Sequence, residues 1–248
     1  MPRIVIPVDF AGLPCDLREL RALADRYGFR ILEDASHATG AQYLGQPVGN
    51  GRFSDLTVFS FHPVKIITTA EGGMVMTNDA AMAARLERLR SHGITRDPAV
   101  MQGEPEGPWV YEQVELGLNY RLTDLQAALG FSQLSQLETS VARRHAIARR
   151  YDAELASLPL VTPWQSPDAH SALHLYPIQL DAARSQMTRR QLFDGLRAAG
   201  VGVNVHYIPV HTQPHYRRLG FAPGQCPVAE AYYAAREARG FPMCKEKV

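Results

Sequence analysis

The chain has 248 residues, of which 46% are hydrophobic and 21% charged, and its formal net charge is +1. This composition is ordinary for a globular protein, and the near-neutral charge excludes binding to nucleic acid or an anionic membrane by bulk electrostatics. No apolar run approaches the ~20 residues that span a bilayer, and we expect no signal peptide in residues 1–8. Three widely spaced cysteines, Cys15, Cys226 and Cys244, predict neither a disulfide framework nor a zinc site and favour a reducing, cytoplasmic location.

The first third of the chain alternates strand and helix patterns. Strands are predicted over residues 3–10, 29–32, 56–61 and 73–77. Helices are predicted over residues 17–27, opened by a capping box at Asp16 and Glu19 and ended by Gly28, and over residues 80–91. This alternation favours an α/β fold with a mostly parallel sheet, in which ligands bind at the carboxyl ends of strands.

The middle of the chain predicts a loop followed by one long helix. Residues 95–115 are rich in Pro, Gly and Glu. Thr123 and Gln126 form a capping box that opens a helix predicted to reach about residue 155. This helix carries Arg143, Arg144, Arg149 and Arg150. Such a stripe can bind nucleic acid, but the acidic neighbours and the near-neutral total charge favour a solvated helix face.

A proline-punctuated segment, residues 159–167, predicts a boundary between two domains. We expect residues 1–160 to form part of a large α/β domain, and residues 168–248 to form a small, incomplete α+β domain. The elements predicted in this second domain are a strand over 174–180, a helix that opens on the capping box of Thr188 and Gln191 and ends at Gly200, and a strand over 201–207.

Two clusters of functional side chains follow predicted strands. The first contains Asp34 and His37, and the second contains Ser60 and Lys65. Each has an ordinary interpretation, as a helix cap with a buried histidine and as a surface lysine. Together they provide what pyridoxal 5'-phosphate (PLP) chemistry needs: an amine for the aldehyde, a carboxylate for the pyridine nitrogen, a hydroxyl for the phosphate and an imidazole beside the ring. The glycine pair 72–73 allows the backbone to pass close to the lysine loop.

Ordered motifs cover nearly the whole chain: residues 10–12, 33–38, 60–65, 71–73, 117–124, 126–128, 133–134, 206–211 and 213–214. In this order they resemble the DegT/DnrJ/EryC1/StrS family of PLP-dependent sugar aminotransferases. The resemblance implies the aspartate-aminotransferase-like fold of PLP-dependent transferases (fold type I), with a partial large domain and a small C-terminal α+β domain.

The resemblance also implies roles for residues at matching positions. Lys65 would form the Schiff base with PLP and move the proton during transamination, and Asp34 would pair with the pyridinium nitrogen. His37 would contact the cofactor ring and Ser60 its phosphate. Asn119 matches a residue that reaches the cofactor phosphate of the other subunit, which implies a homodimer.

Within the family, residues 36–38, 62–69 and 173–178 resemble one branch, the UDP-4-amino-4,6-dideoxy-N-acetyl-β-L-altrosamine transaminase of pseudaminic acid synthesis. A branch that makes 4-amino-arabinose for lipid A also has a histidine at the position of His37. The implied reaction moves an amino group from L-glutamate to C4 of a UDP-linked 4-keto-6-deoxy-N-acetyl sugar for a surface polysaccharide. His206 and Tyr207 match positions near the nucleotide-sugar site, although ordinary polar strand residues are the alternative. The resemblance implies no metal, nucleic-acid or membrane partner.

Both ends of the chain depart from the family pattern. The family's N-terminal segment, which contributes to the phosphate site and the dimer interface, has no counterpart here. At the other end, residues 237–243 differ from the usual strand and the final helix is missing. We therefore expect a truncated chain, for which a remnant without turnover is the alternative to an active enzyme. A sugar dehydratase of the same family has histidine in place of the lysine, so Lys65 argues against that activity.

Overall fold

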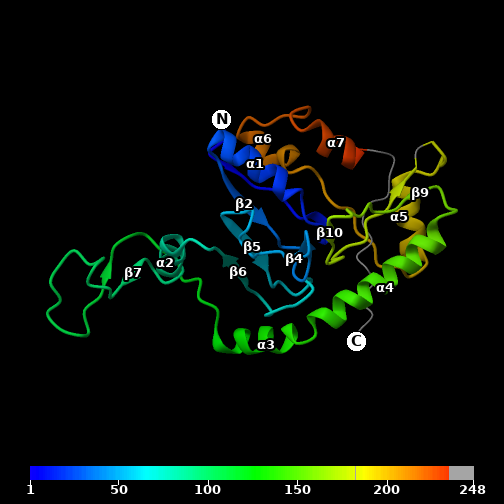
Figure 1. The fold of residues 1–248 in the computed structure, drawn as a ribbon. Coiled ribbons are helices and arrows are strands. Elements are labelled where there is room, and N and C mark those ends of the chain that lie inside the picture. Colours follow the sequence, from blue (N-terminus) through cyan, green and yellow to red (C-terminus); the bar gives the residue numbers. More distant parts are fainter. Residues whose placement is uncertain (182, 235–248) are drawn as a thin grey trace.

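The computed structural model describes residues 1–181 and 183–234 (Figure 1). Cys244 and the terminal motif 237–243 lie outside the described residues, as does the end of the expected second domain. The central sheet has four strands in the order β1 (Ile4–Val5), β2 (Arg30–Asp34), β5 (Leu56–Ser60) and β6 (Gly73–Met76). β1 and β5 run parallel to β2, whereas β6 is antiparallel to β5. The predicted mostly parallel sheet of an α/β fold is confirmed.

Helix α1 (Leu17–Tyr27) packs against this sheet. Ala24 on the helix forms a buried cluster with Phe29 and with Ile31 of β2. The helix ends where predicted, because Gly28 adopts a left-handed conformation with a φ of 74°. The predicted capping box at Asp16 is wrong: the Asp16 carboxylate makes no cap hydrogen bond and instead accepts one from the hydroxyl of Tyr43 at 2.5 Å.

Asp9 and Glu33 form a carboxyl pair with 0% and 1% of their surfaces exposed. Glu33 accepts hydrogen bonds from the hydroxyls of Ser54 at 2.8 Å and Thr57 at 2.7 Å. Asp9 accepts one from the backbone N–H of Cys15 at 2.9 Å. Burial, followed by the repulsion of the Glu33 carboxylate, raises the pKa of Asp9 from 3.8 to about 8.

The Asp9→Asn variant is expected to be more stable than the wild type above neutral pH. The folded wild type retains the Asp9 proton to about pH 8, while the unfolded chain loses it near pH 4. The stability of the wild type therefore falls as the pH rises through this window, by at most about 1.4 kcal/mol per pH unit. Urea denaturation from pH 5 to pH 8 measures the effect. The exposed Asp25→Asn control is expected to follow the wild type, and a parallel curve for Asp9→Asn would contradict the prediction.

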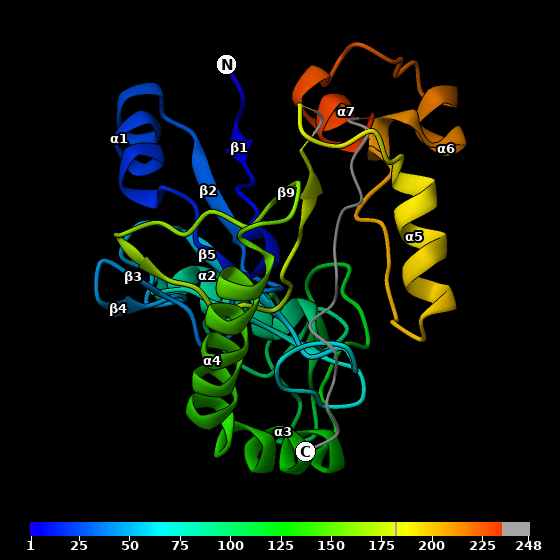
Figure 2. The same ribbon diagram turned by 90° about the vertical axis from the view of Figure 1, so that its right-hand side faces the viewer.

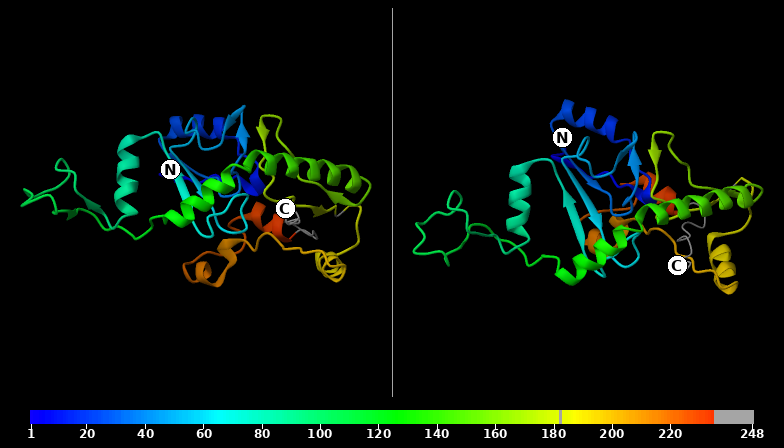
Figure 3. Two further views of the ribbon diagram at one scale, coloured as in Figure 1. Left: turned by 90° about the horizontal axis from the view of Figure 1, so that it is seen from below. Right: turned by 60° about the horizontal axis from the view of Figure 1, so that its bottom comes forward.

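The middle of the chain differs from the prediction in two places. The expected loop contains a short antiparallel pair, β7 (Ile94–Thr95) and β8 (Glu112–Gln113), which follows α2 (Ala80–Leu89). The loop between β7 and β8 projects away from the sheet in Figures 1 and 3. The capping box at Thr123 is confirmed, but the long helix is broken into α3 (Asp124–Leu134) and α4 (Leu137–Leu155). Gln136 leaves the helical conformation at the break, with a φ of −100° and a ψ of 0°.

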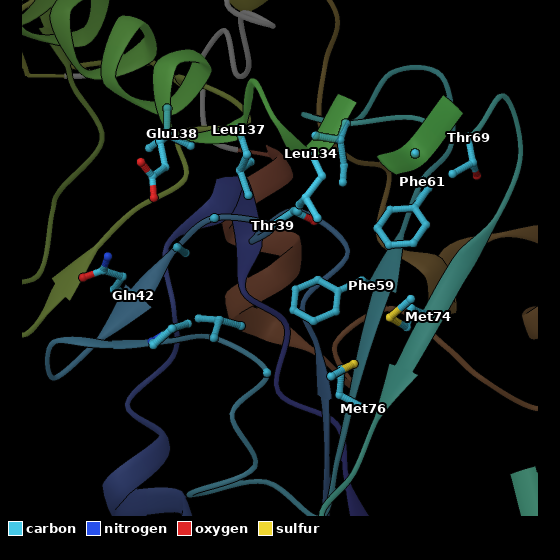
Figure 4. A pocket seen from close by; sticks show the side chains of 18 of the residues that line it. Thr39, Gln42, Phe59, Phe61, Thr69, Met74, Met76, Leu134, Leu137 and Glu138 are labelled. Atoms are coloured by element: carbon cyan, nitrogen blue, oxygen red, sulfur yellow. The ribbon is translucent and has the colours of Figure 1, made fainter. Parts of the chain in front are cut away.

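A cavity of about 920 Å³ lies between the sheet and the α3–α4 pair (Figure 4). Apolar side chains line both sides, among them Phe59, Phe61, Met74, Met76, Leu134 and Leu137. Helix α3 has no buried residue, and its Leu125 and Phe131 are 85% and 81% exposed. A helix with apolar residues on several sides normally packs inside a protein. The described part of the chain leaves this apolar face uncovered.

Short elements from residues 42–47 and 160–234 lie beside the sheet (Figure 2). They are β3 (Gln42–Tyr43) with its partners β4 (Gln46–Pro47) and β10 (Ala169–His170), the pair β9 (Leu160–Val161) and β11 (Gln179–Leu180), α5 (Arg189–Ala198), α6 (Pro214–Arg218) and α7 (Pro227–Ala234). The capping box at Thr188 is confirmed. The strand predicted over 174–180 is reduced to β11, and the stretch 201–207 is not a strand because it has no ladder partner among the described residues. No helix in the described ranges is long and apolar enough to cross a membrane.

Candidate active site

Strand alternation separates the sheet into two chemical faces. Asp34 pairs with Val58 across the parallel strands β2 and β5, and Ser60 lies two residues further along β5. Side chains in register, or two residues apart, point to the same face. Asp34 and Ser60 therefore share one face at the carboxyl ends of the strands. Phe59 and Phe61 point to the opposite face and line the apolar cavity, which contains none of the predicted cofactor residues.

Lys65 lies in the turn that follows β5. Its backbone N–H donates to the carbonyl of His62 at 2.9 Å. The chain then returns towards the sheet, because Phe61 donates to Gly72 at 2.8 Å and a Cβ at Gly73 would lie 2.7 Å from the Phe59 carbonyl oxygen. The glycine pair therefore lets the chain pass close to the end of β5, from which the lysine turn departs. Burial lowers the pKa of Lys65, and the charge of Asp34 opposes this shift.

His37 lies on the turn that follows Asp34. The Asp34 carboxylate accepts a hydrogen bond from the Ser36 N–H at 3.0 Å, which fixes the start of this turn. The Nδ1 of His37 accepts the backbone N–H of Ala11 at 3.3 Å, so a neutral ring carries its proton on Nε2. Burial, and then the charge of Lys65, lowers the pKa of His37 to about 4. The imidazole is therefore neutral at pH 7.

His206 and Tyr207 approach this cluster from the last third of the chain. The ring of Phe10 lies 6.3 Å from that of Tyr207 and 6.0 Å from that of His37. His206 is only 8% exposed, and neither ring nitrogen has a hydrogen-bond partner among the described residues. Because burying an unsatisfied polar group is costly, these nitrogens are available for a bound molecule.

Asn119 is the one predicted site residue that the structure leaves apart from the others. It lies between β8 and α3, where its backbone forms a bridge with Ser91, and it is exposed. Among residues 1–181 and 183–234, no hydrogen bond or ion pair joins it to Lys65 or Asp34.

Three residues at the site were missed by the sequence analysis. Phe10 was placed in a strand but lies in the short helix η1 (Phe10–Gly12). His174 was placed in a strand, yet its ring packs against His37 with centroids 4.5 Å apart. Arg144 was assigned to a solvated helix face, and this assignment is wrong because Nη1 donates to the carbonyls of Leu173 at 3.0 Å and His174 at 3.3 Å. No local pattern distinguishes it from the other arginines of α4.

The donor set fits PLP better than a metal. A half-buried amine with a lowered pKa, a carboxylate, a neutral imidazole and a hydroxyl lie at the ends of neighbouring strands, and among the described residues the buried ring nitrogens of His206 have no hydrogen-bond partner. Metal binding needs several clustered ligands. The described residues contain no group of three or more His, Cys, Asp or Glu side chains that could hold a metal ion.

Gly12→Ala is expected to lower the free energy of unfolding by about 2–4 kcal/mol, because strain and overpacking add at this position. The φ of Gly12 is 97°, and a Cβ would lie 2.9 Å from both the His37 oxygen and the Leu173 nitrogen. Gly28→Ala is the matched control, because its φ is 74° but no atom lies within 4 Å of the added Cβ. Denaturant titration should show a clearly larger loss for Gly12→Ala. Equal losses would show that the close approach is unimportant.

Comparisons with known proteins find relatives over nearly the whole chain. The model of the DegT/DnrJ/EryC1/StrS aminotransferase family matches residues 2–238. The spore coat polysaccharide biosynthesis protein SpsC of Bacillus subtilis is 36% identical over 234 residues, which are 93% of this chain and 59% of SpsC. This chain spans about 60% of the length of the curated relatives it matches.

Two solved structures share the fold and most of this chain. Spr1654 of Streptococcus pneumoniae, described as a sugar aminotransferase and solved in its PMP form, has a TM-score of 0.82 and 30% identity, covering 97% of this chain and 64% of its own. PseC of Helicobacter pylori, an aminotransferase of pseudaminic acid biosynthesis, has a TM-score of 0.81 and 31% identity, covering 96% and 60%. The mixed α/β structure thus has the fold of PLP-dependent aminotransferases of fold type I.

Proposed function

The chain belongs to the DegT/DnrJ/EryC1/StrS aminotransferase family, and from this premise we propose that it carries the catalytic part of a PLP-dependent sugar aminotransferase. The observation that carries the proposal is that Asp34 ends β2 and Lys65 lies in the turn after the neighbouring strand β5, with the neutral His37 on the turn after Asp34. Solved relatives hold the cofactor in both its PLP and PMP forms, which supports the same cofactor here.

Each residue has a distinct role in this proposal. PLP, when bound, supplies an aldehyde for the amino group and a ring that accepts electrons. Lys65 provides the amine that holds the cofactor, and its lowered pKa favours the nucleophilic neutral form. Asp34 keeps the pyridine nitrogen protonated, His37 contacts the ring, and the Ser60 hydroxyl binds the phosphate.

We propose that the enzyme is a homodimer in which Asn119 reaches the cofactor phosphate of the partner subunit. Asn119 is exposed and apart from the other site residues. Exposed apolar side chains flank it, with Leu118 at 54% and Tyr120 at 74%. Such a patch is typical of an interaction surface. An interface there would join Asn119 to a second active site.

The substrate proposal is a UDP-linked 4-keto-6-deoxy-N-acetyl sugar that receives the amine at C4, with L-glutamate as donor. The likeness to PseC supports a sugar of the pseudaminic acid type, and SpsC supports a role in polysaccharide synthesis. The ring nitrogens of His206, which have no partner among the described residues, would bind the sugar nucleotide together with the neighbouring Tyr207. The division into residues 1–160 and 168–248 and the cytoplasmic location belong to the same proposal.

A remnant of the family without turnover is the second candidate. The apolar face of α3, which the described residues leave uncovered, favours this second candidate. A protein with such an exposed face is prone to associate or misfold. The two candidates differ in whether this chain alone assembles the cofactor site.

A visible absorption spectrum of the purified chain with PLP, followed by L-glutamate, tests the proposal. A band of lysine-bound PLP that changes on adding glutamate would show that the site is assembled and runs the first half-reaction. Only the spectrum of free PLP would contradict activity of this chain and favour the remnant.

A further inference from the structure

The irregular segment 171–175 is held directly behind the His37 turn. Ala172 donates its backbone N–H to the carbonyl of Gly12 at 2.9 Å, and Leu175 donates to Ala11 at 3.2 Å. The same Ala11 donates its own N–H to the Nδ1 of His37. A single short helix, η1, therefore fixes both the His37 ring and the segment behind it.

The His174 ring is the part of this segment that contacts His37. It is 7% exposed, and the two rings are tilted by 44° with centroids 4.5 Å apart. The Nδ1 of His174 is buried without a partner among the described residues. Burial lowers the pKa of His174 to about 3, and the charges of Lys65 and Arg144 act in the same direction. Both rings are therefore neutral at pH 7, and they pack together without repulsion between like charges.

Arg144 fixes the backbone of the same segment from helix α4. Its Nη1 donates to two successive carbonyls, those of Leu173 and His174. Within the described ranges no carboxylate forms an ion pair with Arg144. Arg18, Arg85, Arg150 and Arg190 do form ion pairs, and these four side chains are exposed. A half-buried guanidinium that binds only carbonyls is costly to bury. Its local effect is to hold residues 173–174 in one conformation.

We propose that His174, held in place by Arg144, is a positioning residue that fixes the His37 ring for cofactor binding. The inference rests on the proposed contact of His37 with PLP. The titratable groups that face His37 are Lys65, Asp34, His206 and His174. Arg144 acts on His37 only through His174, so its removal should change His37 without touching the cofactor.

Two variants test this proposal: Arg144→Met, which removes the guanidinium, and His174→Asn, which removes the ring. In both, NMR titration of the His37 imidazole without PLP is expected to show its pKa moving up towards the ordinary 6.5, because the packing that excludes water is lost. PLP is expected to bind about tenfold more weakly, while the mass of the Lys65 adduct is unchanged. Arg149→Met, on the exposed face of the same helix, is the matched control and should leave both quantities unaltered.

The outcomes separate this inference from the proposed function. If the wild type binds PLP but both variants leave the His37 titration and the PLP affinity unchanged, the positioning role is overturned and the proposed function stands. If the wild type binds no PLP, the proposed function fails, and the cofactor-free titration still decides whether His174 controls His37. If Arg144→Met does not fold, Arg144→Lys replaces it, and an unchanged His37 titration in Arg144→Lys and His174→Asn overturns the inference. A loss of thermal stability without a change in His37 would show a merely structural role.

Discussion

The Lys65→Ala variant is expected to lose covalent attachment of PLP and to lower the transamination rate on the order of 10⁴-fold, the upper end of the range for a general acid–base group. The physical reason is that one amine serves two roles, holding the cofactor and moving a proton between two carbons. Lys65 is suited to both because burial lowers its pKa, which favours the neutral amine. Single-turnover rates with L-glutamate measure the loss.

The small number of lysines in the chain makes it straightforward to locate a PLP adduct. Its three lysines are Lys65, Lys245 and Lys247, so a borohydride-reduced PLP adduct has few places to form. Peptide mass mapping of the wild type is expected to locate the adduct on Lys65. Lys245→Ala is the control and should retain both adduct and activity. An adduct that persists in Lys65→Ala, or a rate close to that of the wild type, would rule out this lysine as the attachment site.

Asp34→Asn is expected to lower the rate of the glutamate half-reaction by on the order of 10²- to 10³-fold, which corresponds to a rise of about 3–4 kcal/mol in the activation free energy. An amide cannot keep the pyridine nitrogen protonated, so the ring accepts electrons less well. In the wild type the Ser36 N–H donates a hydrogen bond to the Asp34 carboxylate. The side-chain oxygen of an asparagine at this position can accept the same bond, so the turn to His37 should persist.

Rapid mixing of PLP-loaded protein with glutamate measures this half-reaction. Asp25→Asn is a suitable control, because Asp25 is an exposed carboxylate that pairs with Arg21 at 2.8 Å in α1. Its rate should match that of the wild type. A change of less than about twofold in Asp34→Asn, with PLP still bound, would show that another group protonates the pyridine nitrogen.

Local signals in the sequence determined much of the fold. The capping boxes at Thr123 and Thr188 and the stop at Gly28 are present as predicted, because each depends on side chains and backbone within one helical turn. The strands that carry Asp34 and Ser60 were also predicted within one or two residues. Since parallel strands bring their carboxyl ends to one edge, the grouping of Asp34, Ser60 and Lys65 followed from the strand order.

Signals that depend on distant partners were misread. Asp16 stands at the position of a helix cap, but its carboxylate accepts a hydrogen bond from the Tyr43 hydroxyl and does not cap the helix. Residues 201–207 have the composition of a strand, but a strand needs a neighbour, and none of the described elements pairs with them. Both errors arise because the outcome depends on residues distant in the sequence. In the first case such a residue competes for the side chain, and in the second no described strand is available to pair.

By itself, the sequence determined the α/β fold, the family and the acid, amine and imidazole that make a PLP site plausible. Only the tertiary structure decided which side chains surround that site. Arg144 and Arg149 are indistinguishable by local pattern, but Arg144 alone of these two meets the carbonyls of residues 173–174. His174 reaches His37 because Gly12 allows the intervening backbones to approach within van der Waals contact. These contacts join residues that are distant in the sequence, and no local pattern encodes them.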